Sequence, residues 1–127
     1  MKWEKPTAQI IETFEKIVPV IIGIEKRKMF GFPCVFINSN MFMGVFAESI
    51  FLRLSKSDRE QFLELEGAKA FEPLPGRIMK EYAVFPEWIL KHESTDITND
   101  WVYRSFEYAA ALPPKEIKRK KKGTVPF

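Results

Sequence analysis

The sequence has little of the chemistry that most enzymes and metal sites require. Its 127 residues include one Cys, Cys34, and one His, His92. A single Cys excludes an intrachain disulfide and is typical of a reducing cytoplasm, and one Cys with one His is too few for a structural zinc site. A catalytic triad would have to use His92, which lies in a polar stretch typical of an exposed loop. Cys34, between Pro33 and Val35, is predicted to be a buried core residue rather than an activated thiol.

Three further signals are absent. Gly76-Arg77 is not followed by the Lys-Ser/Thr pair of a phosphate-binding loop. The longest apolar stretch, residues 17–24, is far shorter than the ~20 residues needed to cross a bilayer. The N-terminus lacks the apolar run of a signal peptide, because charged residues and Pro6 interrupt it. The sequence therefore predicts a soluble, cytoplasmic protein that has no membrane partner, holds no metal or cofactor and is not an enzyme.

Charge is unevenly distributed along the chain, whose formal net charge is +3. Six cations and one acid fall within residues 115–127, a net charge of +5, which leaves 14 cations and 16 acids, a net charge of −2, in residues 1–114. We expect one folded domain over residues 1–114 and a basic, disordered tail over residues 115–127. The tail fits two interpretations, a solvated chain end or weak, nonspecific contact with nucleic acid.

Hydrophobic residues make up 46% of the chain, enough at this length for one self-sufficient core. Apolar periodicity and helix-ending residues predict helices over residues 6–18, 57–67 and 97–112, with a short helical turn at Pro86. An extended lead-in is expected over residues 20–30, and strands are expected over residues 34–37, 41–46, 50–54, 68–71 and 79–84.

Local turn and capping residues support these boundaries. Asn38-Ser39-Asn40 tolerates the left-handed backbone of a short hairpin, and Pro73-Leu74-Pro75-Gly76 is typical of a turn. Ser57 and Glu60 have the spacing of a capping box at the start of the second helix. The order α-β-β-β-α-β-β-α predicts an α+β fold of two layers, an antiparallel five-stranded sheet with helices on one face.

Two stretches are not explained by core patterning, Lys28-Met29-Phe30-Gly31 and the segment from Phe71 to Tyr82. Each places Gly beside cationic and large apolar side chains, a combination typical of a fixed turn. Together with Phe46 and residues 51–54, they resemble the N-terminal domain of the TfoX/Sxy proteins, bacterial regulators linked to natural competence. The resemblance covers about residues 12–112 and implies the two-layer fold of the type III secretion chaperones, which agrees with the predicted element order.

The sequence departs from the family pattern in two ways. Phe32-Pro33-Cys34 follows Gly31, where family members often have a second Gly. The longer competence regulators carry a C-terminal domain, whereas this chain resembles a stand-alone form that ends in the basic tail. The resemblance therefore carries over the fold and the shared motif residues but not the role in competence.

The two stretches supply the candidate binding patch, which consists of Arg27, Lys28, Met29, Phe30, Gly31, Gly76, Arg77, Met79, Lys80 and Tyr82. One interpretation is functional: two loops present a fixed Arg and an aromatic hydroxyl to a carboxylate, a phosphate or a peptide backbone. The other is structural: the Gly residues form turns, the apolar residues are core, and Arg77 pairs with Glu72 or Glu81. The sequence favours the structural interpretation.

Three hypotheses for the function follow. The first is a small regulatory module that binds an unidentified protein through an apolar sheet face or a strand edge, with a homodimer as one form of that assembly. The second is nucleic-acid binding through the tail and Lys26-Arg27-Lys28, which the absence of aromatic residues among the tail cations weakens. The third, an enzyme that uses Arg77 and Tyr82, is the least favoured.

Overall fold

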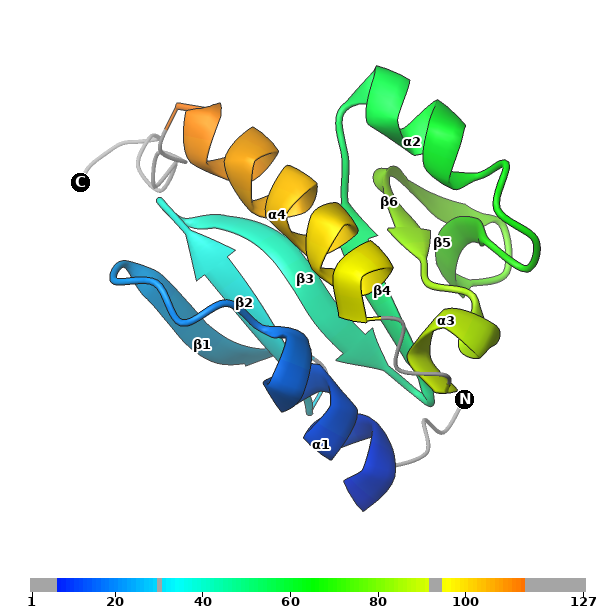
Figure 1. The fold of residues 1–127 in the computed structure, drawn as a ribbon, viewed down its shortest axis with the longest axis horizontal. Coiled ribbons are helices and arrows are strands. Elements are labelled where there is room, and N and C mark those ends of the chain that lie inside the picture. Colours follow the sequence, from blue (N-terminus) through cyan, green and yellow to red (C-terminus); the bar gives the residue numbers. More distant parts are fainter. Residues whose placement is uncertain (1–6, 30, 92–94, 114–127) are drawn as a thin grey trace.

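The computed structural model describes residues 7–29, 31–91 and 95–113, which form four helices and one antiparallel sheet of six strands (Figure 1). The helices are α1 (Ala8–Ile17), α2 (Lys56–Phe62), α3 (Glu87–Lys91) and α4 (Thr95–Ala111). The strands are β1 (Ile24–Met29), β2 (Phe32–Ile37), β3 (Asn40–Phe46), β4 (Ser49–Arg53), β5 (Lys69–Leu74) and β6 (Arg77–Val84). Their order across the sheet is β1-β2-β3-β4-β6-β5.

The predicted α+β class, antiparallel sheet and helical layer are confirmed, but the predicted number of strands is wrong. The lead-in expected over residues 20–30 contains β1, a full strand paired with β2 from Ile24 to Met29. Its central residues, Glu25 to Lys28, are four consecutive charges without apolar alternation. Such a sequence forms a strand here because β1 lies at the edge of the sheet, where side chains on both faces reach solvent.

The main core lies between the sheet and the helices. Figure 1 shows α4 crossing the strands with α1 beside it, and α4 contacts β2, β3 and β4. Phe14 of α1 and Trp101 and Val102 of α4 are buried against the sheet. From the sheet, the buried side chains that meet them include Val35, Phe42, Met43, Ile50 and Leu52. No described helix is long and apolar enough to cross a membrane.

The β2–β3 turn confirms the predicted left-handed backbone. Asn38 and Ser39 have φ of 53° and 66°, and they form a two-residue turn whose twist matches that of its strands. Asn40, expected in the turn, is the first residue of β3, and its buried side chain donates to the carbonyl oxygens of Ala109 (3.4 Å) and Pro113 (3.2 Å). This side chain therefore ties the C-terminal end of α4 to the sheet.

The predicted cap of the second helix is wrong by two residues. Ser55, not Ser57, is the N-cap of α2, and its hydroxyl accepts a hydrogen bond from the backbone N–H of Asp58 at 3.3 Å. Both serines precede an acidic residue by three positions, so the sequence pattern allowed either. The helix ends at Phe62 rather than at Gly67, and residues 63–67 continue as turns.

A second apolar cluster lies on the face of the sheet opposite the helices. Its buried members are Cys34, Met41, Phe51, Phe71 and Val84, and Met29, Phe36, Phe46, Met79 and Tyr82 pack around them. Alternation along the strand puts Phe51 on the same side as Arg53, away from the helices, yet this side chain is fully buried and its ring stacks on Phe71 at 4.2 Å. The prediction of helices on one face holds, yet the other face has a core of its own.

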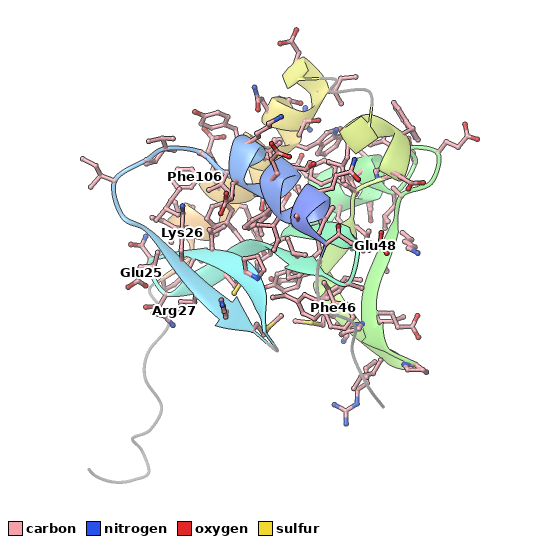
Figure 2. All side chains as sticks on the ribbon, turned by 90° about the horizontal axis from the view of Figure 1, so that it is seen from below. Glu25, Lys26, Arg27, Phe46, Glu48 and Phe106 are labelled. Carbon is pink, nitrogen blue, oxygen red and sulfur yellow. The ribbon has the colours of Figure 1, made fainter. Side chains whose placement is uncertain are left out.

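Strong curvature of the sheet creates this second core. Phe46 of β3 and Phe71 of β5 are separated by two intervening strands, which in a flat sheet would place them about 14 Å apart. Their ring centroids are 5.6 Å apart. Figure 2 shows the β1–β2 and β5–β6 hairpins extending to the same side, with Phe46 between them. The two hairpins thus close the second cluster from either side.

Gly44 allows the ring of Phe51 to reach this position. A Cβ at residue 44 would lie 2.7 Å from Cζ of Phe51, closer than side-chain contacts allow, and 3.0 Å from Cβ of Cys34, a tight contact. We expect Gly44→Ala to lower the free energy of unfolding by about 1–3 kcal/mol, since the buried ring must move. Urea denaturation measures this change. In a Phe51→Leu background the same Gly44→Ala substitution should cost less, and an equal cost in both backgrounds would contradict the steric cause.

Candidate interaction site

The structure brings part of the predicted patch together. Its residues lie on the β1–β2 and β5–β6 hairpins, at opposite edges of the sheet, and the curvature places Met29, Met79 and Tyr82 around the second apolar cluster. Phe30 lies outside the described residues. Gly31 and Gly76 have φ of 84° and 80°, so both supply the turns that the structural interpretation required. The described apolar members of the patch therefore pack against the second apolar cluster.

The hydroxyl of Tyr82 has a partner inside the protein. It donates a hydrogen bond to the carbonyl oxygen of Met41 at 3.0 Å, which joins β6 to β3 across the intervening strand β4. Burial raises the pKa of Tyr82, and the nearby Arg53 guanidinium opposes that effect only in part. At neutral pH the hydroxyl is therefore a proton donor to the backbone and fixes the curvature of the sheet.

The cations of the patch are held in different ways. Arg27 pairs with Glu25 at 2.9 Å and lies over the ring of Phe36 at 4.6 Å. The expected pairing of Arg77 with an acid is not found among the described residues. Glu72 accepts from the backbone N–H of Gly76 at 2.7 Å, and Glu81 accepts from Arg53 at 2.6 Å and from Tyr108 at 3.3 Å.

Lys28, Arg77 and Lys80 are exposed. Lys28 lies on β1, whereas Arg77 and Lys80 lie on β6, and the second apolar cluster lies between these two strands. The hypothesis that these cations and Tyr82 act on one ligand stays a prediction. The Tyr82 hydroxyl and the Arg27 guanidinium already have partners within the chain.

The only Cys has no environment that would activate it. Cys34 is 1% exposed, and its thiol lies 3.5 Å from the carbonyl oxygen of Arg27. Burial raises the pKa of the Cys34 thiol, and the charge of Arg27 opposes this only in part. Among the described residues, no three His, Cys, Asp or Glu side chains gather as metal ligands. His92 lies outside the described residues.

A surface that the sequence interpretation missed lies at the other side of β1. The loop from α1 to β1 exposes Val20 and Ile22 almost completely, at 103% and 100%. The backbone N–H of Ile24 donates to the carbonyl oxygen of Ile21 at 3.3 Å, and Gly23 at φ 104° completes a tight turn with Ile22 at its corner. The turn holds Ile22 in solvent at the start of β1.

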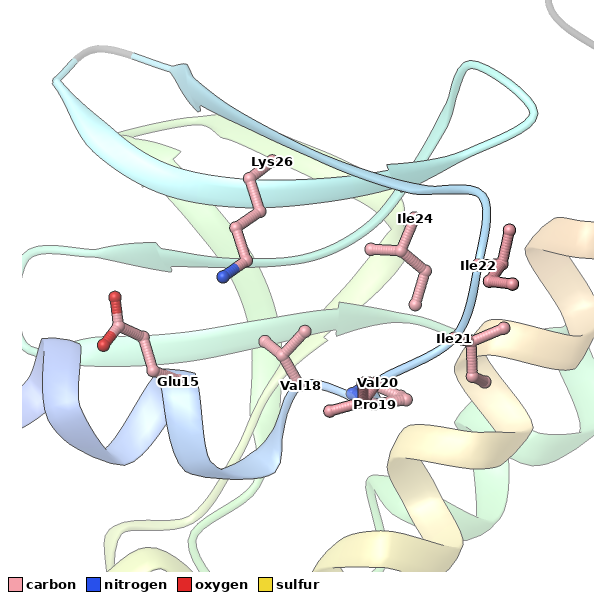
Figure 3. A pocket seen from close by; sticks show the side chains of 8 residues that line it. All are labelled: Glu15, Val18, Pro19, Val20, Ile21, Ile22, Ile24 and Lys26. Atoms are coloured by element: carbon pink, nitrogen blue, oxygen red, sulfur yellow. The ribbon is translucent and has the colours of Figure 1, made fainter.

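A depression separates β1 from the end of α1 (Figure 3). Its volume is about 330 Å³, and its apolar lining includes Val18, Pro19 and Ile24. The side chains of Glu15 and Lys26 lie at its charged margin and point toward one another in Figure 3. The apolar loop, the depression and β1 form one continuous surface, which we name the β1 edge: residues 18–22, Ile24, Lys26 and Lys28.

The two edges of the sheet differ in how open they are. On its outer side β1 has no partner strand among the described residues, and it contains neither Pro nor a register shift. At the opposite edge, β5 contains Pro73 and two register shifts, features that prevent pairing with a further strand. A signal for the β1 edge was present in the sequence, in the apolar Val20-Ile21-Ile22 ahead of Gly23, but it does not by itself reveal exposure.

Comparison with protein families finds one match. The model of the TfoX N-terminal domain matches residues 18–109. The chain belongs to the TfoX N-terminal domain family. The match spans β1 to most of α4, and it confirms the resemblance drawn from the two Gly-containing stretches. Comparisons with curated proteins and with solved structures find no match to this TfoX-type domain.

The role of Tyr82 in this TfoX-type domain can be tested by removing its hydroxyl. We expect Tyr82→Phe to lower the free energy of unfolding by about 1–2 kcal/mol, because the carbonyl group of Met41 loses its partner. Tyr103→Phe is the matched control, since Tyr103 is half exposed on α4 and should be neutral. Equal stability of the two variants would contradict a structural role for the Tyr82 hydroxyl.

The raised pKa of Tyr82 also predicts a dependence of stability on pH. The folded state favours the neutral phenol, so this contribution is complete below the unfolded pKa of about 10 and is lost as the pH rises through the folded pKa. We expect urea midpoints to fall above pH about 10, and to fall less in Tyr82→Phe. An identical pH profile in both proteins would contradict the proposed effect of burial.

Proposed function

We propose that this protein is a small, non-catalytic interaction module that binds another protein along the β1 edge. The observation that carries the proposal is the open outer side of β1 beside two fully exposed apolar residues, Val20 and Ile22. Strand edges are commonly protected by Pro, by register shifts or by charged side chains. Of these β1 has only the charges, and large aliphatic side chains are exposed beside it, a combination that suits pairing with a partner of complementary charge. Membership of the TfoX N-terminal domain family agrees with a regulatory role, and a role in competence belongs to this proposal only through the family.

The remaining chemistry supports binding over catalysis. The hydroxyl of Tyr82 hydrogen-bonds to the backbone, and the thiol of Cys34 is buried with a raised pKa. The third hypothesis, an enzyme that uses Arg77 and Tyr82, needs these two side chains at one reaction centre. Tyr82 packs in the second apolar cluster and Arg77 is exposed at the start of β6, so nothing in this arrangement favours a reaction.

Nucleic-acid binding finds less support in the geometry. Successive side chains of a strand point to opposite faces, so Lys26 and Lys28 lie on one face of β1 and Arg27 on the other. Arg27 is also already paired with Glu25. The three consecutive cations therefore do not form one basic surface. The basic tail lies outside the described residues and stays a prediction.

A homodimer also stays a prediction, and the surface first expected to form it is largely closed. That expectation rested on an uncovered apolar sheet face, whereas Phe51 and Phe71 on that face are buried within one chain. Light scattering on dilution measures the assembly state directly. The β1 edge gives the module a binding surface in the monomeric protein as well.

Site-specific crosslinking tests the proposed function. A benzophenone amino acid at Val20 should give discrete protein adducts on irradiation in cells, because this position is fully exposed on the proposed surface. The same amino acid at Tyr103, half exposed on α4, is the control and should give none of those adducts. Identical adducts at both positions, or adducts with nucleic acid alone, would overturn the proposal.

A further inference from the structure

We infer that the partner of the β1 edge is an extended, acidic peptide segment that adds to β1 as a further antiparallel strand. The inference rests on the proposed function and names the chemistry of the partner. It follows from three properties of the β1 edge: the direction of its backbone groups, the sign of its charge, and the apolar depression beside Ile24.

The register of β1 determines which backbone groups face outward. The N–H of Ile24 donates to Ile21, which lies outside the sheet, while the carbonyl oxygen of Arg27 lies next to Cys34 of β2. In an antiparallel ladder the direction of these groups alternates from one residue to the next. The N–H and C=O groups of Lys26 and Lys28 therefore point away from β2. A further strand can pair with them without any change in the sheet.

The charge of the edge selects against a second copy of β1 and in favour of an acidic segment. β1 carries Lys26, Arg27 and Lys28 against Glu25 alone, and Glu25 is paired with Arg27. If two copies of β1 paired antiparallel through these outward groups, Lys26 would stand opposite Lys26 or Lys28 of the other copy, and like charges directly opposite are destabilising. Acidic side chains opposite Lys26 and Lys28 are attracted instead.

The depression adds one apolar position to this specificity. Ile24, Lys26 and Lys28 share the face of β1 that is turned toward the helices, because they pair with β2 residues whose side chains, such as Val35 and Ile37, are in the main core. A strand added to β1 would place one side chain beside Ile24, next to the depression of about 330 Å³, and others beside the two lysines. The matching segment has an apolar residue opposite Ile24 and an acidic residue opposite each of Lys26 and Lys28. One residue separates each of these positions from the next.

The probe is a synthetic peptide containing Glu-Thr-Glu-Thr-Val, in which antiparallel pairing sets Val opposite Ile24 and the two Glu residues opposite Lys26 and Lys28. We expect it to bind, and we expect the amide signals of Lys26 and Lys28 to shift in NMR spectra. A peptide with Lys in place of both Glu residues should bind at least about tenfold more weakly. Equal binding of the two peptides would overturn the inference, as would tighter binding of a short DNA or RNA duplex.

N-methylation separates strand addition from simple charge attraction without altering the protein. Antiparallel pairing directs the N–H groups of the Glu and Val residues toward β1 and those of the Thr residues away from it. Methylating the Glu and Val amides should weaken binding by about tenfold or more, whereas methylating the Thr amides should have little effect. Equal effects of the two modifications would show that no added strand forms.

Variants of the protein complete the test. Lys26→Pro removes the outward N–H and should weaken peptide binding more than Lys26→Ala, which keeps it. Circular dichroism confirms that both variants are folded. Combining Lys26→Glu with Lys28→Glu should reverse the preference toward the Lys peptide, and an unchanged preference would overturn the inference. If the peptide tests fail while benzophenone at Val20 still gives its protein adducts in Lys26→Pro, the proposed function stands and only the acidic strand is excluded.

Discussion

The contact between Phe51 and the bare backbone of Gly44 is the constraint on which the shape of the sheet depends. The ring lies within 2.7 Å of the position that a Cβ at residue 44 would take, and there it stacks on Phe71 of β5. Because β6 lies between β4 and β5, this stack joins the side chains of two strands that are not neighbours, as a curved sheet allows. The hydrogen bond from Tyr82 to Met41 crosses the same concave face and fixes the curvature. A domain with one helical layer thereby obtains two apolar cores.

This packing determines which surfaces are left for binding. The face of the sheet opposite the helices, a natural candidate for an interface, is filled by side chains of the same chain. Several polar groups of the family-typical stretches, among them the Tyr82 hydroxyl and the Glu72 carboxylate, are engaged in internal contacts. The β1 edge differs in kind, since its backbone groups face outward and Val20 and Ile22 are exposed beside it. The function proposed for this edge rests on backbone geometry more than on any reactive side chain.

Elements with strong local signals could be predicted from the sequence. The helices at residues 8–17 and 95–111 have apolar faces of the right period. The turns have residues suited to their backbone, which is left-handed at Asn38, at Ser39 and at Gly76, directly after Pro75. Elements with weak local signals were predicted wrongly. The four consecutive charges of β1 do not alternate with apolar residues, so the sequence does not indicate a strand there. Two equivalent Ser-x-x-acid patterns precede α2, so the sequence does not decide whether Ser55 or Ser57 is its N-cap. β1 is a strand because it pairs with β2, and α2 begins after Ser55 because the Ser55 hydroxyl accepts from the N–H of Asp58; neither sequence pattern specifies these contacts.

The sequence by itself determined the fold class, the family, the burial of Cys34 and the scarcity of catalytic and metal-binding side chains, because composition, periodicity and motif spacing are local properties of the chain. Only the tertiary structure decided that Phe51 is buried rather than outward-facing, that Tyr82 reaches Met41, and that β1 is an open edge. Each of these depends on curvature and strand order. Both arise from contacts between residues far apart in the sequence, which no local pattern encodes.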